Sequence, residues 1–169
     1  MTDAAIPDGP PPPEVVEQAK QILEHAELVN IHPVEIRASR TEATGAARDV
    51  RVEATAQYSV ASGAMSNRFR YQLEIVDGGE QTLAEIDFTL QVDYEVEADY
   101  EPSGEGADFL AGTTGLFAVY PYARELAQSL TTRLQLDPLV LGMLPRGASS
   151  PSAISQVARP SGPGAEGGV

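Results

Sequence analysis

The stretch LFAVYPYARELAQSLTTRLQL, residues 116–136, decides the fold. Its apolar residues recur three or four positions apart, which places them on one face of an amphipathic helix: Leu116, Tyr120, Ala123, Ala127, Leu130 and Leu134. Pro121 lies inside this pattern, where proline removes an N–H and crowds the carbonyl four residues earlier. The helix is therefore predicted to begin at Pro121 or to kink there. Thr113 and Thr114 favour the kink, because they offer an earlier N-cap.

The layer that covers this helix is predicted to be a β-sheet. Four segments with strand-like alternation precede the helix: residues 28–40, 50–60, 68–76 and 84–100. The first contains a one-residue slip at Pro33, which is typical of a bulge on an edge strand. The order of segments predicts an α+β fold, in which a four-stranded antiparallel sheet is packed by the long C-terminal helix.

The fourth segment is the most regular of the four. Every even position from 84 to 100 is apolar, and the odd positions from 85 to 99 are polar, most of them acidic. One face of this strand should be buried and the other solvated. At about 3.3 Å per residue the strand would be about 55 Å long. It must therefore bend or pair with another subunit.

The remaining segments define the domain limits. Residues 13–27 are predicted to form an extra N-terminal helix, with Pro13 at its first position and this apolar stripe: Val15, Ala19, Ile22, Leu23 and Ala26. Residues 101–115 are predicted to be a glycine-rich connection. The proline-rich residues 1–12 and the Pro/Gly/Ser-rich residues 145–169 are predicted to be disordered. A single domain should span residues 13–144.

Composition excludes several classes of function. The net charge of −14 argues against nucleic acid or an anionic membrane surface as a partner. Cysteine is absent, no apolar run is long enough to span a membrane, and residues 1–13 lack the features of a signal peptide. These features predict a cytoplasmic protein. The two histidines lack metal-type spacing and no nucleophile motif or phosphate-binding loop occurs, so we predict no enzyme, metal site or cofactor.

Acidic residues dominate the stretch between Arg70 and Arg124, which contains no Lys or Arg. The sheet is therefore predicted to carry a face of one charge sign. Two interpretations remain open. The acidic face keeps the protein soluble and protects it from aggregation, or it docks a basic partner.

The segment VYPYARELAQSLTTRLQLDPL resembles the bacterial export chaperone family SecB. The resemblance rests on Pro121, Tyr122, Ala123, Arg124 and Glu125, which we interpret as structural, and on the following Leu134, Leu136 and Pro138. It implies a cytoplasmic chaperone that assembles as a homotetramer, a dimer of dimers. Leu83 and Glu85 resemble the pair with which this family contacts the motor protein SecA, and with Asp87 they form a predicted docking site.

The sequence departs from the family pattern in three places. The connection SRTEATGAARD between the first two strands is short, the second C-terminal helix is not predicted, and an N-terminal helix is added. This combination resembles divergent SecB-like chaperones, some of which protect an antitoxin. The resulting hypothesis is an ATP-independent holdase for unfolded or export-bound chains. The alternative is a dedicated adaptor for one partner segment, such as an antitoxin.

Apolar residues without an evident place in a two-layer core are the predicted client-binding residues: Phe109, Leu110, Leu139, Val140, Leu141, Met143 and Leu144. For each of them, packing in the core or in an oligomer is the competing interpretation. The client-binding interpretation predicts that serine at 141 and 144 weakens holdase activity without unfolding the protein. The predicted disorder of the C-terminus implies that truncation after Gly147 leaves stability unchanged.

Overall fold

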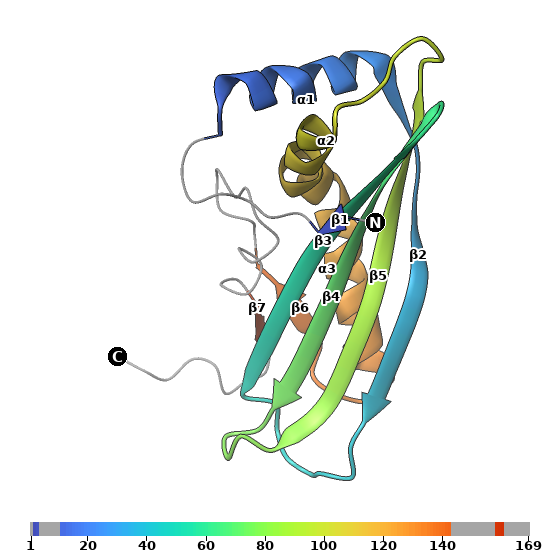
Figure 1. The fold of residues 1–169 in the computed structure, drawn as a ribbon. Helices are drawn as coiled ribbons and strands as arrows, with labels where there is room; N and C mark the ends of the chain where they lie inside the picture. Colours follow the sequence, from blue (N-terminus) through green and yellow to red (C-terminus); the bar gives the residue numbers. More distant parts are fainter. Residues whose placement is uncertain (1, 4–10, 143–157, 161–169) are drawn as a thin grey trace.

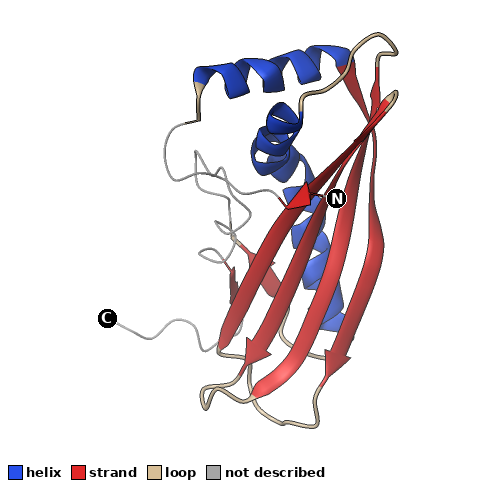
Figure 2. Cartoon of the chain, viewed as in Figure 1, coloured by secondary structure: helices blue, strands red, loops and turns tan. Residues whose placement is uncertain are grey.

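The computed structural model describes residues 2–3, 11–142 and 158–160. Its central element is an antiparallel sheet with the helices on one face (Figure 1; Figure 2). The sheet order is β1-β3-β4-β5-β2, with these strands: β1 Thr2–Asp3, β2 Ala26–Arg40, β3 Asp49–Ala61, β4 Ala64–Val76 and β5 Thr82–Val96. The predicted fold class, with four long antiparallel strands and a long C-terminal helix, is confirmed.

The alternating residues of β4 and β5 build the core as their period predicts. Their inward side chains are all buried, from Phe69 to Ile75 on β4 and from Ala84 to Val96 on β5. Tyr71 and Phe88 lie opposite each other and stack with ring centroids 5.0 Å apart. Full burial of a side chain of this size contributes about 1.5–3 kcal/mol. The central pair of strands therefore supplies much of the driving force for folding.

Strand β5 is shorter than the sequence suggests. It ends at Val96 and pairs with β4 on one side and β2 on the other, so it leaves no length for pairing outside the protomer. Tyr100 lies beyond the strand in a turn closed by its N–H and the Glu97 carbonyl at 3.1 Å. There its ring stacks on His25, whose Nδ1 is 2.7 Å from the Glu97 carboxylate. These contacts tie the end of the N-terminal helix to the end of β5.

The predicted bulge of the edge strand is present. The pairing of β2 with β5 shifts register twice, between Leu28 and Asn30 and between Pro33 and Glu35. The residue outside the ladder at the second shift is Val34, while Pro33 lies opposite Leu90. Proline is tolerated on an edge strand beside a bulge because no ladder hydrogen bond needs its missing N–H there. Strand β2 forms one edge of the main sheet, as the proline predicts.

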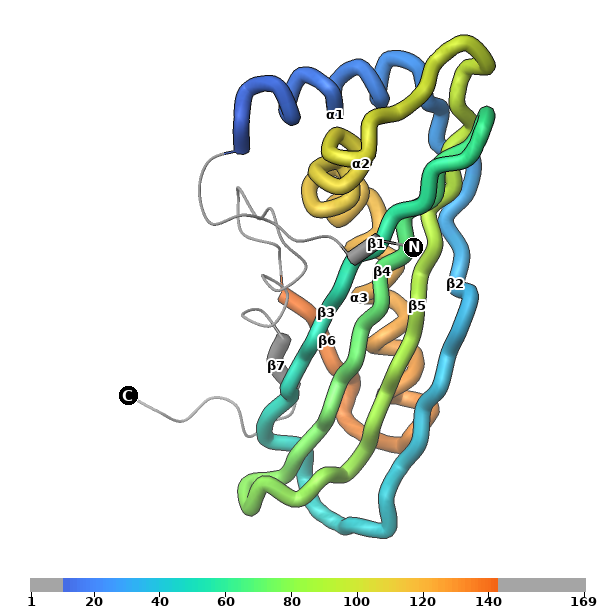
Figure 3. The backbone as a smooth tube through the Cα atoms, viewed as in Figure 1, coloured from blue at the N-terminus to red at the C-terminus, as the bar shows by residue number. Residues whose placement is uncertain are grey.

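Three helical elements follow β5 as one path through residues 104–133 (Figure 3). They are α2 Gly104–Leu110, the π-helical turn η1 Ala111–Gly115 and α3 Leu116–Arg133. The predicted glycine-rich connection is therefore wrong. Ser103 caps α2 by accepting a hydrogen bond from the Gly106 N–H at 3.1 Å. The low helix propensity of glycine is overridden because α2 packs against the N-terminal helix α1, Pro13–His25.

The start of the long helix also differs from the prediction. Helix α3 neither begins nor ends at Pro121, and the irregular turn lies upstream, at η1. Thr113 does not cap a helix, since its hydroxyl donates to the Phe109 carbonyl at 2.7 Å within the helical path. Threonine makes this bond to a carbonyl of the preceding turn when it lies inside a helix.

Gly106 lets α1 and α2 approach closely. A Cβ at this position would lie 2.8 Å from Ser103 Oγ and 2.9 Å from Gln18 Cβ. We therefore expect Gly106→Ala to lower the free energy of unfolding by about 1–2 kcal/mol, because the clash exceeds the gain in helix propensity of about 1 kcal/mol. Urea unfolding measures the change. Gly78→Ala is the control, since its Cβ would meet only Arg48 Cγ at 3.6 Å. Equal stability of the two variants would contradict the tight packing.

Two short strands complete the described chain. Strand β6, Leu139–Leu141, pairs with β7, Ala158–Pro160, in an antiparallel two-stranded sheet. Strand β7 thus lies within residues 145–169, for which disorder is predicted, and the other residues of that range lie outside the described part. Of residues 1–12, residues 2–3 form β1 and pair with β3 at Tyr58 and Gln57, residues 11–12 lead into α1, and the others lie outside the described part. Among the residues described, no helix is long and apolar enough to cross a membrane.

Candidate functional site

The predicted client-binding residues are mostly buried. Leu110, Leu139 and Leu141 belong to the core, so their prediction as contact residues is wrong for the folded protomer. Phe109 is half-buried, and Val140 keeps 39% of its surface exposed. Met143 and Leu144 lie outside the described residues. Leu110 is buried because the predicted loop is a helix, and the β6 leucines are buried because β6 packs along α3.

The structure also does not bring the predicted residues together. Phe109 and Leu110 lie on α2, beside α1, whereas residues 139–141 lie on β6 along the later part of α3 (Figure 1). A single continuous client surface through all of them is therefore absent from the described part of the protomer. Among the members of the predicted set that the structure describes, Val140 is the most accessible side chain.

Strand β6 is held extended by a small set of contacts with α3. The buried Thr131 hydroxyl accepts from the Leu139 N–H at 3.0 Å, and it donates to the Ala127 carbonyl at 2.9 Å. The Tyr120 hydroxyl donates to the Gly142 carbonyl at 2.6 Å. Burial raises the pKa of Tyr120, so its hydroxyl stays protonated and keeps this bond at neutral pH.

The side of β6 that faces away from α3 pairs with another strand. Because the Leu139 N–H points toward α3, and the hydrogen-bonding direction alternates along a strand, Val140 presents its N–H and C=O to the other side. There it lies opposite Arg159 of β7. Strand β7 also contacts β3. We call the hydrogen-bonding side of Leu139–Leu141 the β6 edge.

Two further apolar surfaces were not predicted. The first, the β2 patch, consists of Leu28, Val29, Val34 and Ile36, and Val29 alone is 60% exposed. On α3, Phe117 and Tyr122 are about half exposed and lie about 140° apart around the helix axis. We call the helix face between them the α3 patch. The β2 patch had a visible signal, since residues 28–36 combine apolar side chains on both faces with a proline that marks an edge. Neither patch is covered within the described protomer.

The residues that carry the family resemblance differ in burial. Ala123 is fully buried, Arg124 is half-buried, and Pro121, Tyr122 and Glu125 are exposed. The structural role of the motif stays a prediction. The motif lies on α3 at the turn where one face packs on the sheet and the opposite face carries the α3 patch.

The predicted docking site loses one of its three residues. Leu83 is fully buried beneath the loop that follows β2, where the Thr41 N–H donates to the Leu83 carbonyl at 2.9 Å. Its prediction as a contact residue is therefore wrong. Glu85 is exposed on the outer face of the sheet, and Asp87 pairs with Arg70 on the same face. This pair of carboxylates is what remains of the predicted site.

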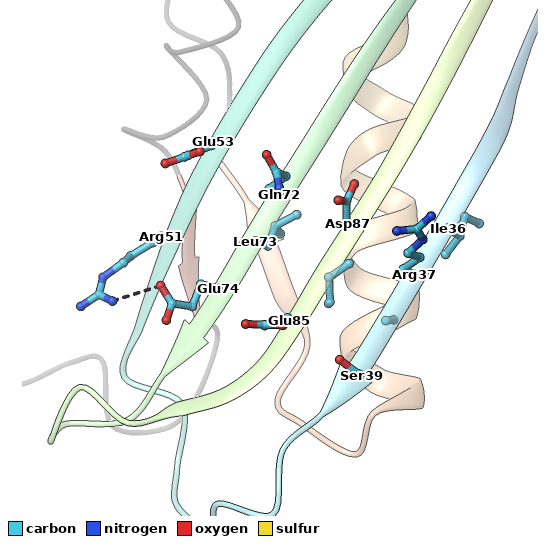
Figure 4. A pocket seen from close by; sticks show the side chains of 12 residues that line it. Ile36, Arg37, Ser39, Arg51, Glu53, Gln72, Leu73, Glu74, Glu85 and Asp87 are labelled. Atoms are coloured by element: carbon cyan, nitrogen blue, oxygen red, sulfur yellow. Dashed lines mark hydrogen bonds and ion pairs between the residues drawn. The ribbon is translucent and has the colours of Figure 1, made fainter.

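The outer face is not of one charge sign, contrary to the prediction. Arg51 pairs with Glu74 at 3.0 Å (Figure 4). Arg68 Nε donates to Gln91 Oε1 at 2.6 Å. Strands β2, β3 and β4 bring arginines that lie outside the acidic stretch of the sequence. A shallow pocket on this face is accordingly lined by Arg37 and Arg51 as well as by glutamates. Within residues 11–142, no group of side chains is spaced to hold a metal ion.

The Asp87–Arg70 pair makes stability sensitive to acid. The hydrogen bond from Arg70 lowers the pKa of Asp87. The contribution of the pair to the free energy of unfolding is therefore present above about pH 4, and it is lost as the pH falls through the lowered pKa. Asp87→Asn should therefore reduce the loss of stability between about pH 4.5 and 2.5, by less than about 1 kcal/mol because the pair is near the surface. Urea unfolding at several pH values measures this. A Glu53→Gln control on the same face should keep the wild-type slope, and an unchanged slope in Asp87→Asn would contradict the pairing.

Comparison with known proteins supports the resemblance. No protein-family model matches the sequence. The chain is 44% identical over 64 residues to the SecB-like chaperones Rv1957 and MT2006 of two Mycobacterium tuberculosis strains, a match that covers 37% of this chain and 35% of each relative. The chain thus spans about a third of the length of these curated relatives.

A solved structure extends the match across the fold. It is the Mycobacterium tuberculosis SecB-like chaperone Rv1957 in complex with a ChAD peptide from the antitoxin HigA1. The TM-score is 0.70 at 26% sequence identity, and the alignment covers 77% of this chain and 98% of that chain. The predicted resemblance to a divergent SecB-like protein is confirmed.

Proposed function

Because the chain is SecB-like in sequence and in fold, we propose that it is an ATP-independent molecular chaperone. It binds unfolded or export-bound polypeptides and keeps them from aggregating, without chemistry of its own. The relatives that it matches are named chaperones. Nucleotide independence is supported by the sequence, which contains no glycine-rich phosphate-binding loop.

The observation that carries the proposal is the β6 edge. Its backbone is held extended by Thr131 and Tyr120, and it pairs with a short extended segment of polypeptide. Pairing through main-chain groups is tolerant of sequence, because every residue except proline offers the same donor and acceptor. The exposed Val140 side chain adds a small apolar contact. A holdase needs this combination of extended-chain binding and low sequence specificity.

The acidic composition suits the same role. A protein that exposes apolar surface associates with itself unless its charge keeps copies and complexes apart. The net charge of −14 provides that repulsion. We place the protein in the cytoplasm, where clients still await export or folding.

The alternative function is a dedicated adaptor for one segment, and a specific observation favours it. The solved structure of the similar protein contains a bound peptide from the antitoxin HigA1. A panel of reduced and alkylated model proteins of unrelated sequence separates the two functions. A holdase co-elutes with most of the panel in gel filtration, whereas an adaptor co-elutes with none of them and requires its own partner.

The assembly that we propose is a homotetramer built as a dimer of dimers. Such an assembly needs two different self-complementary interfaces, and the protomer exposes two separate apolar patches, on β2 and on α3. The two-residue alternation also places Glu35 opposite Arg37 if two β2 strands pair antiparallel about Ile36. Glu85 and Asp87 stay available on the outer face for a basic docking partner such as SecA.

A further inference from the structure

The β6 edge is occupied by the chain's own C-terminal region. Strand β7 pairs antiparallel with β6, with Leu139 opposite Pro160, Val140 opposite Arg159 and Leu141 opposite Ala158. The segment comes from far along the chain, because residues 142–157 separate the two strands. It therefore reaches β6 in the way that a separate extended peptide would.

The alternation of hydrogen-bonded and non-hydrogen-bonded positions along β6 explains how a proline-containing segment can pair with it. The Leu139 N–H is already bound by Thr131, so the position opposite Leu139 requires no donor from β7. Pro160, which lacks an N–H, takes this position. Arg159 lies opposite Val140, where the β6 edge presents its N–H and C=O. The segment Ala158–Pro160 thus matches the alternation of β6.

Charge favours the same contact. The full chain has a net charge of −14. Residues 143–169 contain Arg146, Arg159 and Glu166, a net +1, so residues 1–142 carry −15. The C-terminal region therefore has a net charge opposite in sign to that of the rest of the chain, which favours contact between the two.

We infer that the segment at Ala158–Pro160 is an internal occupant of the β6 edge, which an extended client segment must displace. Three residues form a weak strand, and tethering compensates by raising the local concentration of the segment to about the millimolar range. A longer client strand with more main-chain pairing outcompetes it. The competition rests on the proposed function, whereas the pairing of β7 with β6 does not.

The test uses proline at two adjacent positions. Arg159→Pro removes the N–H at the hydrogen-bonding position, whereas Ala158→Pro places proline opposite Leu141, where no donor is needed. Arg159→Gln controls for the lost charge, and truncation after Gly147 removes the segment entirely. Hydrogen–deuterium exchange of residues 138–142 reports on the β6 edge. Fluorescence anisotropy with a reduced and alkylated model protein reports on client affinity.

We expect exchange at Val140 to be at least tenfold faster in Arg159→Pro and in the truncated chain, and unchanged in Ala158→Pro and Arg159→Gln. Affinity for the unfolded model protein should rise about threefold to tenfold in the first two. Equal exchange in the full and truncated chains, or equal effects of the two prolines, would overturn the internal pairing. Faster exchange without a gain in affinity would overturn the competition. If no form binds the model protein, the proposed function fails while the exchange result decides the pairing.

Discussion

Leu141→Ser is expected to lower the free energy of unfolding by about 3–5 kcal/mol. Leu141 is 0% exposed and anchors β6 in the core along α3. Removing a buried leucine side chain leaves a cavity, and the serine hydroxyl adds an unpaired polar group. Urea unfolding measures the loss. The client-binding interpretation of the sequence predicts the opposite, namely that serine at this position spares stability.

Val140→Ser is the matched control for this experiment. Val140 is the next residue, on the same strand, and its side chain points outward. The same chemical change should cost less than about 1 kcal/mol there, as surface changes do. If the two variants have the same free energy of unfolding, then Leu141 is exposed in solution and β6 does not pack against α3.

Ile36→Asp is expected to break the assembly. Ile36 belongs to the β2 patch and is 44% exposed in the protomer. If two β2 strands meet in the oligomer, a carboxylate at this position must be desolvated without a partner, which costs several kcal/mol. A cost of about 3 kcal/mol weakens association more than a hundredfold. The mass at micromolar concentration should therefore fall from four subunits to two or one.

Multi-angle light scattering coupled to gel filtration measures this mass. Ser39→Asp is the control, because residue 39 lies on the same strand but pairs opposite Glu85 on the outer, polar face. It should retain the wild-type mass. An unchanged mass for Ile36→Asp would show that β2 is not an interface, and a monomeric wild type would remove the proposed tetramer.

Patterns that extend over many residues predict the fold well. The alternation of residues 84–96 and the helical period after Leu116 fix which faces are buried, because a one-residue error would expose a whole row of apolar side chains. Pro33 likewise marks β2 as an edge. The end of β5 is less predictable, since Tyr100 continues the alternation yet leaves the strand to stack on His25.

Short segments carry too little pattern to predict their environment. Residues 139–141 are three apolar residues in a row. Nothing in them shows that the Thr131 hydroxyl binds the Leu139 N–H and that Tyr120 binds the carbonyl of the following Gly142, while Val140 faces outward. The sequence does not predict helix α2, because glycine disfavours helix. Gly106 is nevertheless required in this helix, since only glycine allows the close contact with α1. The residues of strand β7 have low strand propensity. Pro160 fits because it lies opposite Leu139, where β6 needs no donor from β7.

The charge pattern misleads for a different reason. The acidic stretch from residue 71 to residue 123 is real in sequence, but a sheet face combines strands from distant parts of the chain. Arg51 and Arg70 enter the same face from β3 and β4 and pair with Glu74 and Asp87. The charge of a sheet face therefore depends on the strand order, which the sequence alone does not predict.

The most direct test of the central claim is suppression of aggregation by the full chain. A guanidinium-unfolded model protein is diluted into buffer with or without the chain, and light scattering follows aggregation. We predict that an excess of the wild type removes most of the scattering. Val140→Pro, which removes the N–H of the β6 edge, should protect several times less well, whereas Val140→Ala should act nearly as wild type. Undiminished scattering with the wild type, or equal protection by Val140→Pro, would contradict the claim that the chain holds extended clients at the β6 edge.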